Sequence, residues 1–304
     1  MTDILLHEVG LRDGLQMESL TVPTPQKLQW ARMLMNSGID IIQVGSFVHP
    51  AKVPQMADTD RLFADLAASG EKPANVVFSG LVLNEKGLER GLACGVEMFC
   101  LGVSASETHS RKNTGMGIAE ATGRIIAVAQ QAGAAGKRVQ VSVQSAFGCG
   151  YEGQVPRERV LSIVRRYCDA GLKNISLADT AGHAVPDQVE GMFSAVAAID
   201  GGVDMACHFH NTYGLGLANV YAALRAGVRS FESSVAGLGG CPFTKIAGGN
   251  VCTEDLVHMF RTMGLRRDVK LDKLVGVAQD IAKFFGREMP GMVYRTGTLE
   301  LAPE

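Results

Sequence analysis

The stretch from residue 174 to residue 214 reads NISLADTAGHAVPDQVEGMFSAVAAIDGGVDMACHFHNTYG. It begins with a short β-like run at 174–177, continues with an amphipathic helical pattern at 185–199, and returns to a β-like run at 204–209. Such runs on either side of a helical period predict a strand–helix–strand unit, the building block of a parallel sheet.

The same unit recurs along the chain. β-like runs lie at 4–9, 39–44, 75–81, 97–102, 138–143, 174–177, 204–209 and 229–233. Helical patterns separate them at 25–36, 59–68, 85–93, 118–135, 157–170, 185–199 and 215–226. Eight strands alternating with helices over roughly 250 residues predict a TIM (β/α)8 barrel, with a doubly wound open sheet as the alternative.

The chain continues beyond the eighth predicted strand. Further helical patterns lie at 253–262 and 271–285, followed by a tail that carries Gly and Pro. We expect a single catalytic domain over residues 1–304, with the barrel at about 3–265 and C-terminal cap or interface helices at about 266–304.

The composition is that of a compact globular enzyme. Of the 304 residues 46% are hydrophobic, and 29 basic against 31 acidic residues leave a net charge of -2, which favours no nucleic acid. No apolar run approaches the roughly 18 residues of a membrane span, so we expect no membrane partner. Seven scattered Cys fit a reducing compartment, and a start without an export or import signal predicts a cytoplasmic protein.

One cysteine lies in a glycine-rich loop. In the segment from Val235 to Asn250, Gly residues occupy positions 237, 239 and 240 before Cys241 and positions 248 and 249 after it. Glycines permit positive φ and a close approach to a ligand, or a lid movement, so the loop predicts a reactive thiol. The alternative is a surface loop in which the cysteine has no role.

Another candidate site combines one carboxylate with two imidazoles. His208 and His210 are two residues apart at a predicted strand end, so both side chains point to the same face. Asp13 follows the first predicted strand, and the carboxyl ends of barrel strands converge on one mouth. This set predicts a divalent-cation site, and the hard oxygen ligand favours Mg²⁺ or Mn²⁺. The alternative is a polar histidine pair without a metal.

Together these segments resemble the hydroxymethylglutaryl-CoA lyase family among the metal-dependent TIM-barrel lyases and synthases. The resemblance spans nearly the whole chain and includes Arg12-Asp13-Gly14-Leu15-Gln16, His208-x-His210 and Gly-Leu-Gly-Gly-Cys-Pro at 237–242. The wider superfamily shares the first two motifs, whereas the cysteine loop is particular to the lyases. The resemblance implies a divalent-metal-dependent lyase that takes an acyl-CoA substrate, cleaves 3-hydroxy-3-methylglutaryl-CoA to acetyl-CoA and acetoacetate, and forms a homodimer or higher homo-oligomer.

The resemblance also implies roles for individual residues. It adds Asn250 as a fourth metal ligand, places Arg12 at the thioester carbonyl, and makes Cys241 the proton donor to the thioester enolate. Arg12 has a simpler alternative, an ion pair with Glu8 or Asp13, and both roles are compatible. The base that deprotonates the tertiary hydroxyl is Asp13 or His208, and the sequence does not choose between them. The residues expected to line the acyl pocket are Gln16, Gln43, Ser46, Ser142, Asp179 and Thr180.

Three positions depart from the family pattern. Gln43 stands where these lyases usually have Glu, Ala178 replaces a Gly, and Asn211 follows the second histidine where many have Asp. The metal ligands, the arginine and the cysteine are kept, so we expect the same type of reaction. The three changes leave more than one substrate compatible with the sequence. Citramalyl-CoA and a longer-branched 3-hydroxyglutaryl-CoA are the alternatives.

Two other functions compete with the lyase. A synthase that condenses acetyl-CoA with a 2-oxo acid would share the Arg-Asp-Gly and His-x-His-Asn motifs, but the cysteine loop argues against it. A non-catalytic barrel that keeps its metal is the alternative outside enzymes, and the retention of every reactive position argues against that.

Overall fold

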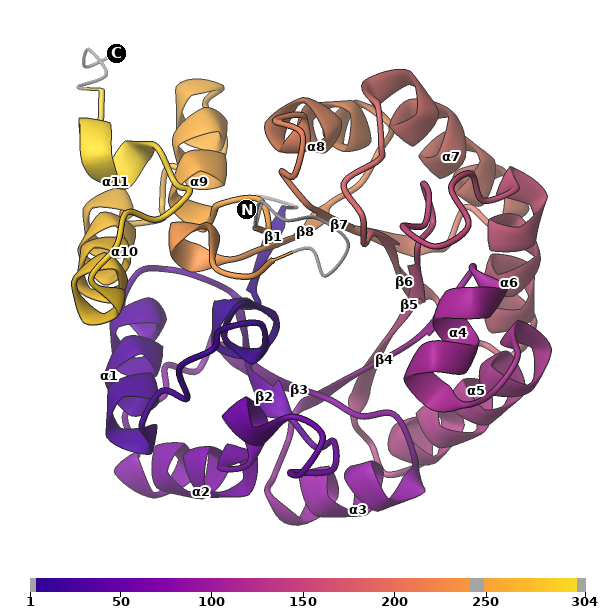
Figure 1. Cartoon of the computed structure of the whole chain (residues 1–304), viewed down its shortest axis with the longest axis horizontal. Coiled ribbons are helices and arrows are strands. Elements are labelled where there is room, and N and C mark those ends of the chain that lie inside the picture. Colours follow the sequence, from indigo (N-terminus) through magenta and orange to yellow (C-terminus); the bar gives the residue numbers. More distant parts are fainter. Residues whose placement is uncertain (1–3, 241–248, 300–304) are drawn as a thin grey trace.

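A computed structural model describes residues 4–240 and 249–299, and within them eight parallel strands close into a barrel with helices outside (Figure 1). The strands are β1 (Leu5–Glu8), β2 (Ile41–Ser46), β3 (Val77–Leu81), β4 (Met98–Ser104), β5 (Arg138–Gln144), β6 (Asn174–Asp179), β7 (Asp204–Phe209) and β8 (Ser230–Ser233). Each strand pairs with its successor in sequence, and β1 pairs with β8. The TIM-barrel prediction is confirmed, and the open-sheet alternative is wrong.

Helices follow the strands in the predicted order. They are α1 (Thr24–Met35), α2 (Thr59–Ser69), α3 (Glu85–Ala93), α5 (Ile118–Ala134), α6 (Arg157–Asp169), α7 (Pro186–Ile199) and α8 (Gly216–Arg225), then α9 (Thr253–Thr262) and α10 (Leu271–Phe285). The sequence analysis missed α4 (Glu107–Thr114), α11 (Val293–Thr296) and the short turns η1 (Gly10–Gly14), η2 (Pro54–Met56) and η3 (Val235–Gly237). These segments are short or carry mostly polar side chains, so no apolar period marks them.

Two apolar clusters hold the barrel together. The large one lies between the outer face of the strands and the surrounding helices. A small separate cluster of Ile41, Met98 and Cys100 lies on β2 and β4, with Val77 and Leu81 of β3 against it. Every residue of β4 is buried, as expected for a strand covered on both faces.

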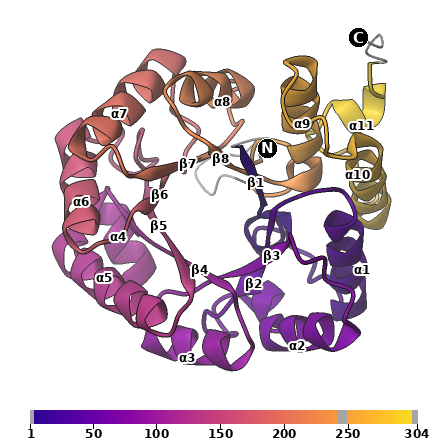
Figure 2. The same ribbon diagram turned by 180° about the vertical axis from the view of Figure 1, so that it is seen from behind.

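The segment after β8 packs against the start of the chain. Helix α10 lies beside α1 in both views of the ribbon, and α9 and α11 lie next to α10 (Figures 1 and 2). The indole of Trp30 on α1 meets the ring of Phe284 edge-on at 5.3 Å between centroids, and its Nε1 donates to Asp280 at 2.7 Å. These contacts join α10 to the wall of the barrel.

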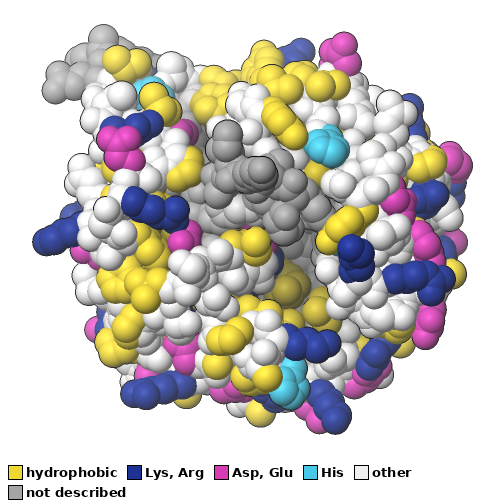
Figure 3. Space-filling model, in the orientation of Figure 1, with side chains coloured by type: hydrophobic (Ala, Val, Ile, Leu, Met, Phe, Trp, Pro, Cys, Tyr) yellow, Lys and Arg dark blue, Asp and Glu magenta, His cyan; other side chains and the backbone are white. Residues whose placement is uncertain are grey.

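The outer surface carries charges of both signs. Basic and acidic side chains are interspersed around the face seen in Figure 3. None of the helices in the described part of the chain combines the length and the apolar character needed to cross a bilayer.

Arg266 ties together the chain segments at the amino ends of β1 and β2. Its side chain is 2% exposed and donates to the carbonyl oxygens of Ile4 and Gly38, each at 3.0 Å. It also donates to the Asp40 carboxylate at 2.5 Å, and that carboxylate accepts the Leu6 N–H at 2.8 Å. One buried guanidinium therefore joins the starts of β1 and β2 to the segment that follows α9.

Replacing this guanidinium with an apolar chain should destabilise the barrel. Arg266→Met would leave two carbonyl groups and Asp40 without their donor, and we expect a loss of about 3 kcal/mol in unfolding free energy. The measurement is urea denaturation. Arg61→Met is the control, because that exposed arginine forms an ion pair with Asp65 on the surface of α2 and its loss should cost less than about 1 kcal/mol. Equal effects of the two substitutions would contradict the role of Arg266.

Candidate active site

The predicted metal-binding side chains converge at the carboxyl ends of β1 and β7. Asp13 lies in η1 directly after β1, His208 in β7 and His210 just beyond it. One ligand atom from each of these three residues lies within 4.8 Å of the other two. Asn250 joins them through a bridge between its backbone and that of His210.

Glu8 holds the turn that presents Asp13. The backbone of η1 forms a single π-helical turn in which the Gly14 N–H donates to the Val9 carbonyl at 3.4 Å, and the Asp13 N–H donates to the same carbonyl at 2.8 Å. The buried Glu8 carboxylate accepts the Gly10 N–H at 2.7 Å. A side chain on Gly10 would begin 2.6 Å from that carboxylate, so the turn requires glycine there.

Two buried polar atoms at the cluster point to a cation ligand. The Asn250 amide donates to Asp13 at 2.9 Å and to the Leu238 carbonyl at 3.1 Å, which leaves its Oδ1 free. Asn250 Oδ1 and His210 Nδ1 are both buried without a partner among the described residues. One carboxylate, one amide oxygen and two imidazoles are a donor set that fits Mg²⁺ or Mn²⁺.

The charges at the cluster favour the protonation states in which Asp13 and His210 can bind a metal. Burial alone would raise the pKa of the Asp13 carboxyl, but Arg12 and the two imidazoles hold it well below its usual range. Burial and the neighbouring His208 lower the pKa of His210 to about 4. Asp13 is therefore ionised and His210 neutral at neutral pH, as metal ligation requires.

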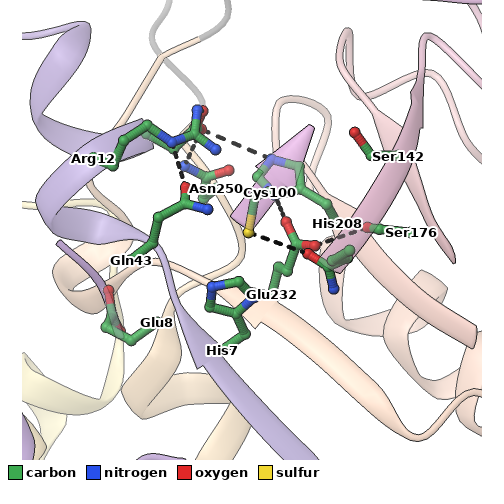
Figure 4. A network of polar contacts seen from close by, with 12 residues as sticks. His7, Glu8, Arg12, Gln43, Cys100, Ser142, Ser176, His208, Glu232 and Asn250 are labelled. Atoms are coloured by element: carbon green, nitrogen blue, oxygen red, sulfur yellow. Dashed lines mark hydrogen bonds and ion pairs between the residues drawn. The ribbon is translucent and has the colours of Figure 1, made fainter. Parts of the chain in front are cut away.

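Arg12 lies between Asp13 and Gln43. Its Nε donates to Gln43 Oε1 (Figure 4), and its Nη1 donates to Asp13 Oδ1. Of the two ion pairs considered from the sequence, the structure contains the one with Asp13, while Glu8 accepts backbone groups instead. Gln16 Nε2 also donates to Asp13, at 3.1 Å.

The remaining predicted residues are distributed around the mouth. Ser46 Oγ is buried without a partner among the described residues, and Ser142 donates to the Leu101 carbonyl at 3.3 Å. The Asp179 carboxylate accepts the N–H groups of His183 and Ala184, and Thr180 accepts the Ser145 N–H at 3.0 Å. Asp179 and Thr180 thus hold the loops after β6 and β5. Cys241 lies outside the described residues.

Sequence reasoning missed a second row of polar side chains inside the barrel. Glu232 on β8 contacts His208 and Ser176 (Figure 4), and His7 on β1 contacts Ser79. The available signal was strand alternation, because residues two apart on β1 and β8 share the inner face. The sequence does not show which of these inward-facing side chains contact one another.

Comparison with known proteins places the chain in a family. The family model described as HMGL-like matches residues 3–281. The hydroxymethylglutaryl-CoA lyase YngG of Bacillus subtilis is 37% identical over 287 residues, covering 94% of this chain and 95% of that protein. The mitochondrial hydroxymethylglutaryl-CoA lyase of Rattus norvegicus is 40% identical over 290 residues, covering 95% and 88% respectively.

This chain belongs to the HMGL-like family. The resemblance inferred from the sequence is confirmed, and with it the enzyme class, a carbon–carbon lyase. The family depends on a divalent metal, and Asp13, His208 and His210 form a cluster able to hold one.

Solved structures agree with this assignment. The crystal structure of the Bacillus subtilis HMG-CoA lyase has a TM-score of 0.92 and 35% identity, covering 97% of this chain and 98% of that one. An HMG-CoA lyase from Acinetobacter baumannii, in complex with coenzyme A and 3-methylmalate, has a TM-score of 0.89 and 34% identity, covering 99% and 98%. The carboxyl transferase domain of Rhizobium etli pyruvate carboxylase, at 15% identity and a TM-score of 0.71, shares the fold alone.

Two buried carboxylates hold the start of the segment that leads to the family's cysteine loop. Glu8 accepts the Val235 N–H and Glu254 accepts the Ala236 N–H, each at 3.0 Å. Ala236 has a φ of 60°, a left-handed conformation that costs a non-glycine residue energy and needs such support. Burial raises the pKa of Glu254 to about 8, and its Oε1 has no hydrogen-bond partner among the described residues.

The raised pKa of Glu254 should make stability depend on pH. A carboxyl whose pKa is 4.5 when unfolded and about 8 when folded favours folding below pH 4.5, and this contribution is lost as the pH rises through 8. Glu254→Gln keeps the shape and stays neutral. We therefore expect its melting temperature, relative to that of the wild type, to rise by a few degrees between pH 6 and pH 9.

Differential scanning fluorimetry at each pH measures the effect of Glu254→Gln. The matched control is Glu158→Gln, because that exposed carboxylate pairs with Arg165 on the outside of α6. A difference between Glu254→Gln and the wild type that does not change with pH would contradict the assignment of a neutral buried acid.

Asp13 supplies the only anionic ligand of the three-residue cluster, so its loss should weaken metal binding strongly. Asp13→Asn keeps the size of the side chain, and we expect the affinity for Mn²⁺ to fall on the order of 100-fold. Isothermal titration of metal-free protein measures it. Asp272→Asn on α10 is the control and should bind Mn²⁺ like the wild type; unchanged affinity in Asp13→Asn would place the metal elsewhere.

Proposed function

We propose that the protein cleaves 3-hydroxy-3-methylglutaryl-CoA to acetyl-CoA and acetoacetate with Mg²⁺ or Mn²⁺ bound to Asp13, His208, His210 and Asn250. The observation that carries the proposal is the buried Asn250 Oδ1 at the cluster of Asp13 and the two imidazoles, with Arg12 paired to Asp13. The relatives named as lyases of this substrate, over nearly the full chain, support it.

The reaction is a retro-Claisen cleavage. The C3 hydroxyl loses its proton, the C2–C3 bond breaks, and its electron pair forms the enolate of acetyl-CoA while C3 becomes the ketone of acetoacetate. The enolate carbon then takes up a proton. A divalent cation at the four ligands would polarise the oxygens on which charge changes.

Arg12 is suited to the enolate oxygen. Its Nε and Nη1 are engaged by Gln43 and Asp13, which fixes the plane of the guanidinium. Its Nη2 has no hydrogen-bond partner in residues 4–240 and 249–299, so it is free to donate to the thioester oxygen. A fixed donor aimed at a site of developing negative charge is among the strongest contributions to catalysis.

Asp13 and His208 are the two candidate bases for the hydroxyl proton. Asp13 is a weak base because its pKa is low. A His208 ring that binds the cation through Nε2 and donates from Nδ1 to Glu232 has no free lone pair, so His208 can take the proton only while it is off the cation. Proton delivery to the enolate falls to Cys241, whose role the family implies.

The amide side chain of Gln43 is a reason to test a second substrate. Its amide replaces the carboxylate usual at this position, so the site beside Arg12 carries one negative charge less. The Acinetobacter baumannii relative was solved in complex with coenzyme A and 3-methylmalate, a hydroxy dicarboxylate with a shorter carbon chain than hydroxymethylglutarate. Citramalyl-CoA is therefore the second candidate.

The first experiment incubates reduced protein and Mg²⁺ with each of the two thioesters and follows acetyl-CoA by mass spectrometry. We expect acetyl-CoA and acetoacetate from 3-hydroxy-3-methylglutaryl-CoA, and Arg12→Met should lower kcat by about 1,000-fold. Cleavage of citramalyl-CoA alone would transfer the proposal to that substrate. No product from either, with Mg²⁺ or Mn²⁺, would overturn it.

A further inference from the structure

Glu232 makes two directed contacts beneath the metal ligands. Its side chain is 8% exposed and extends from β8 into the barrel (Figure 4). Glu232 Oε2 lies 3.0 Å from His208 Nδ1, and Oε1 accepts the hydroxyl of Ser176 at 2.8 Å. The contact follows from the register, because His208 and Glu232 are directly paired across β7 and β8.

The contact determines which nitrogen of His208 faces the metal site. An ionised carboxylate only accepts hydrogen bonds, so His208 Nδ1 must carry a hydrogen. The lone pair of a neutral imidazole then lies on Nε2, the atom that is 3.8 Å from Asp13 Oδ2. Glu232 thus selects the tautomer of His208 that can bind a cation beside Asp13.

The other imidazoles of the barrel lack this support. Within residues 4–240 and 249–299, no hydrogen bond joins either ring nitrogen of His210 to a carboxylate, and its Nδ1 is buried without a partner there. His7, also inside the barrel, bonds through Nε2 to Ser79 at 2.9 Å rather than to Glu232. The hydrogen bonds of Glu232 in the described part of the chain therefore go to Ser176 and His208 alone.

We propose that Glu232 is a positioning residue that fixes the ring and the tautomer of His208 for metal binding, with Ser176 fixing Glu232 in turn. The proposal rests on the metal site of the proposed function, but not on the substrate. Carboxylates that accept from the second nitrogen of a ligand histidine orient the ring and increase its basicity, and their removal commonly weakens metal binding 10- to 100-fold.

Two substitutions separate orientation from charge. Glu232→Gln keeps an acceptor for His208 but removes the negative charge, and we expect about a 10-fold weaker affinity for Mn²⁺. Glu232→Ala removes both, and we expect about a 100-fold loss. Isothermal titration of metal-free protein with Mn²⁺ measures the affinities, and melting temperatures show whether each variant is folded.

The chain offers a matched pair of serines as a control. Ser176→Ala removes the bond that holds Glu232, whereas Ser79→Ala removes an equally buried hydroxyl that contacts His7. We expect weaker Mn²⁺ binding, by roughly threefold to tenfold, for the first and wild-type affinity for the second. Wild-type affinity in Glu232→Ala, or an equal loss in the two serine variants, would overturn the proposal.

The tautomer provides a readout that a purely structural role would not change. In metal-free protein labelled with ¹⁵N-histidine, at a pH where the rings are neutral, long-range ¹H–¹⁵N spectra identify the protonated nitrogen. We expect Nδ1–H for His208 in the wild type and mainly Nε2–H in Glu232→Ala. The same pattern in both proteins would count against the proposal even if metal binding fell.

Metal binding and lyase activity are measured separately, so the two proposals fail separately. If neither thioester is cleaved while Glu232→Ala loses Mn²⁺ affinity, the positioning role stands and the substrate is wrong. If the wild type cleaves its substrate and Glu232→Ala binds Mn²⁺ normally, the function stands and the positioning role is wrong.

Discussion

The buried carboxylate of Glu8 is the contact on which the site depends. It lies at the seam where β1 meets β8 and accepts the N–H groups of Gly10 and Val235 and the hydroxyl of Thr253. Those three donors belong to the turn that carries Asp13, the segment that follows β8, and the start of α9. Burial raises the pKa of Glu8 to about 7, and the hydrogen bonds from these three donors counter part of that rise.

Closing the barrel is what allows so many polar groups to be buried. A parallel sheet satisfies its own backbone, which leaves the inward side chains free to hydrogen-bond with one another across the barrel. Ser176, Glu232 and His208 come from three neighbouring strands, β6, β8 and β7, and their contacts exist only when all three are in register. The fold therefore sets the orientation of the candidate metal ligands above them.

The sequence predicted the parts of the fold that repeat. The bounds of β7, α9 and α10 agree residue for residue with the periods seen at 204–209, 253–262 and 271–285. It did not predict η1, because five residues are too few to show a period. It also missed Glu232, whose partner Ser176 is 56 residues away and comes near only through barrel closure. The motifs identified Asp13 and the histidines because each motif lies within a few consecutive residues.

The pairing of Arg12 with Gln43 has an electrostatic consequence for the reaction. A carboxylate at position 43 would share the positive charge of the guanidinium, whereas an amide fixes the guanidinium without neutralising it. The negative charge inside the barrel is instead held by Asp13, which lies against Arg12, and by Glu232, which is hydrogen-bonded to His208 and Ser176 rather than to Arg12. If Arg12 faces the enolate, as proposed above, more of its positive charge is then available to that anion in a buried site, where the interaction is strongest. Under that proposal, the amide at position 43 suits an anionic intermediate better than a carboxylate would.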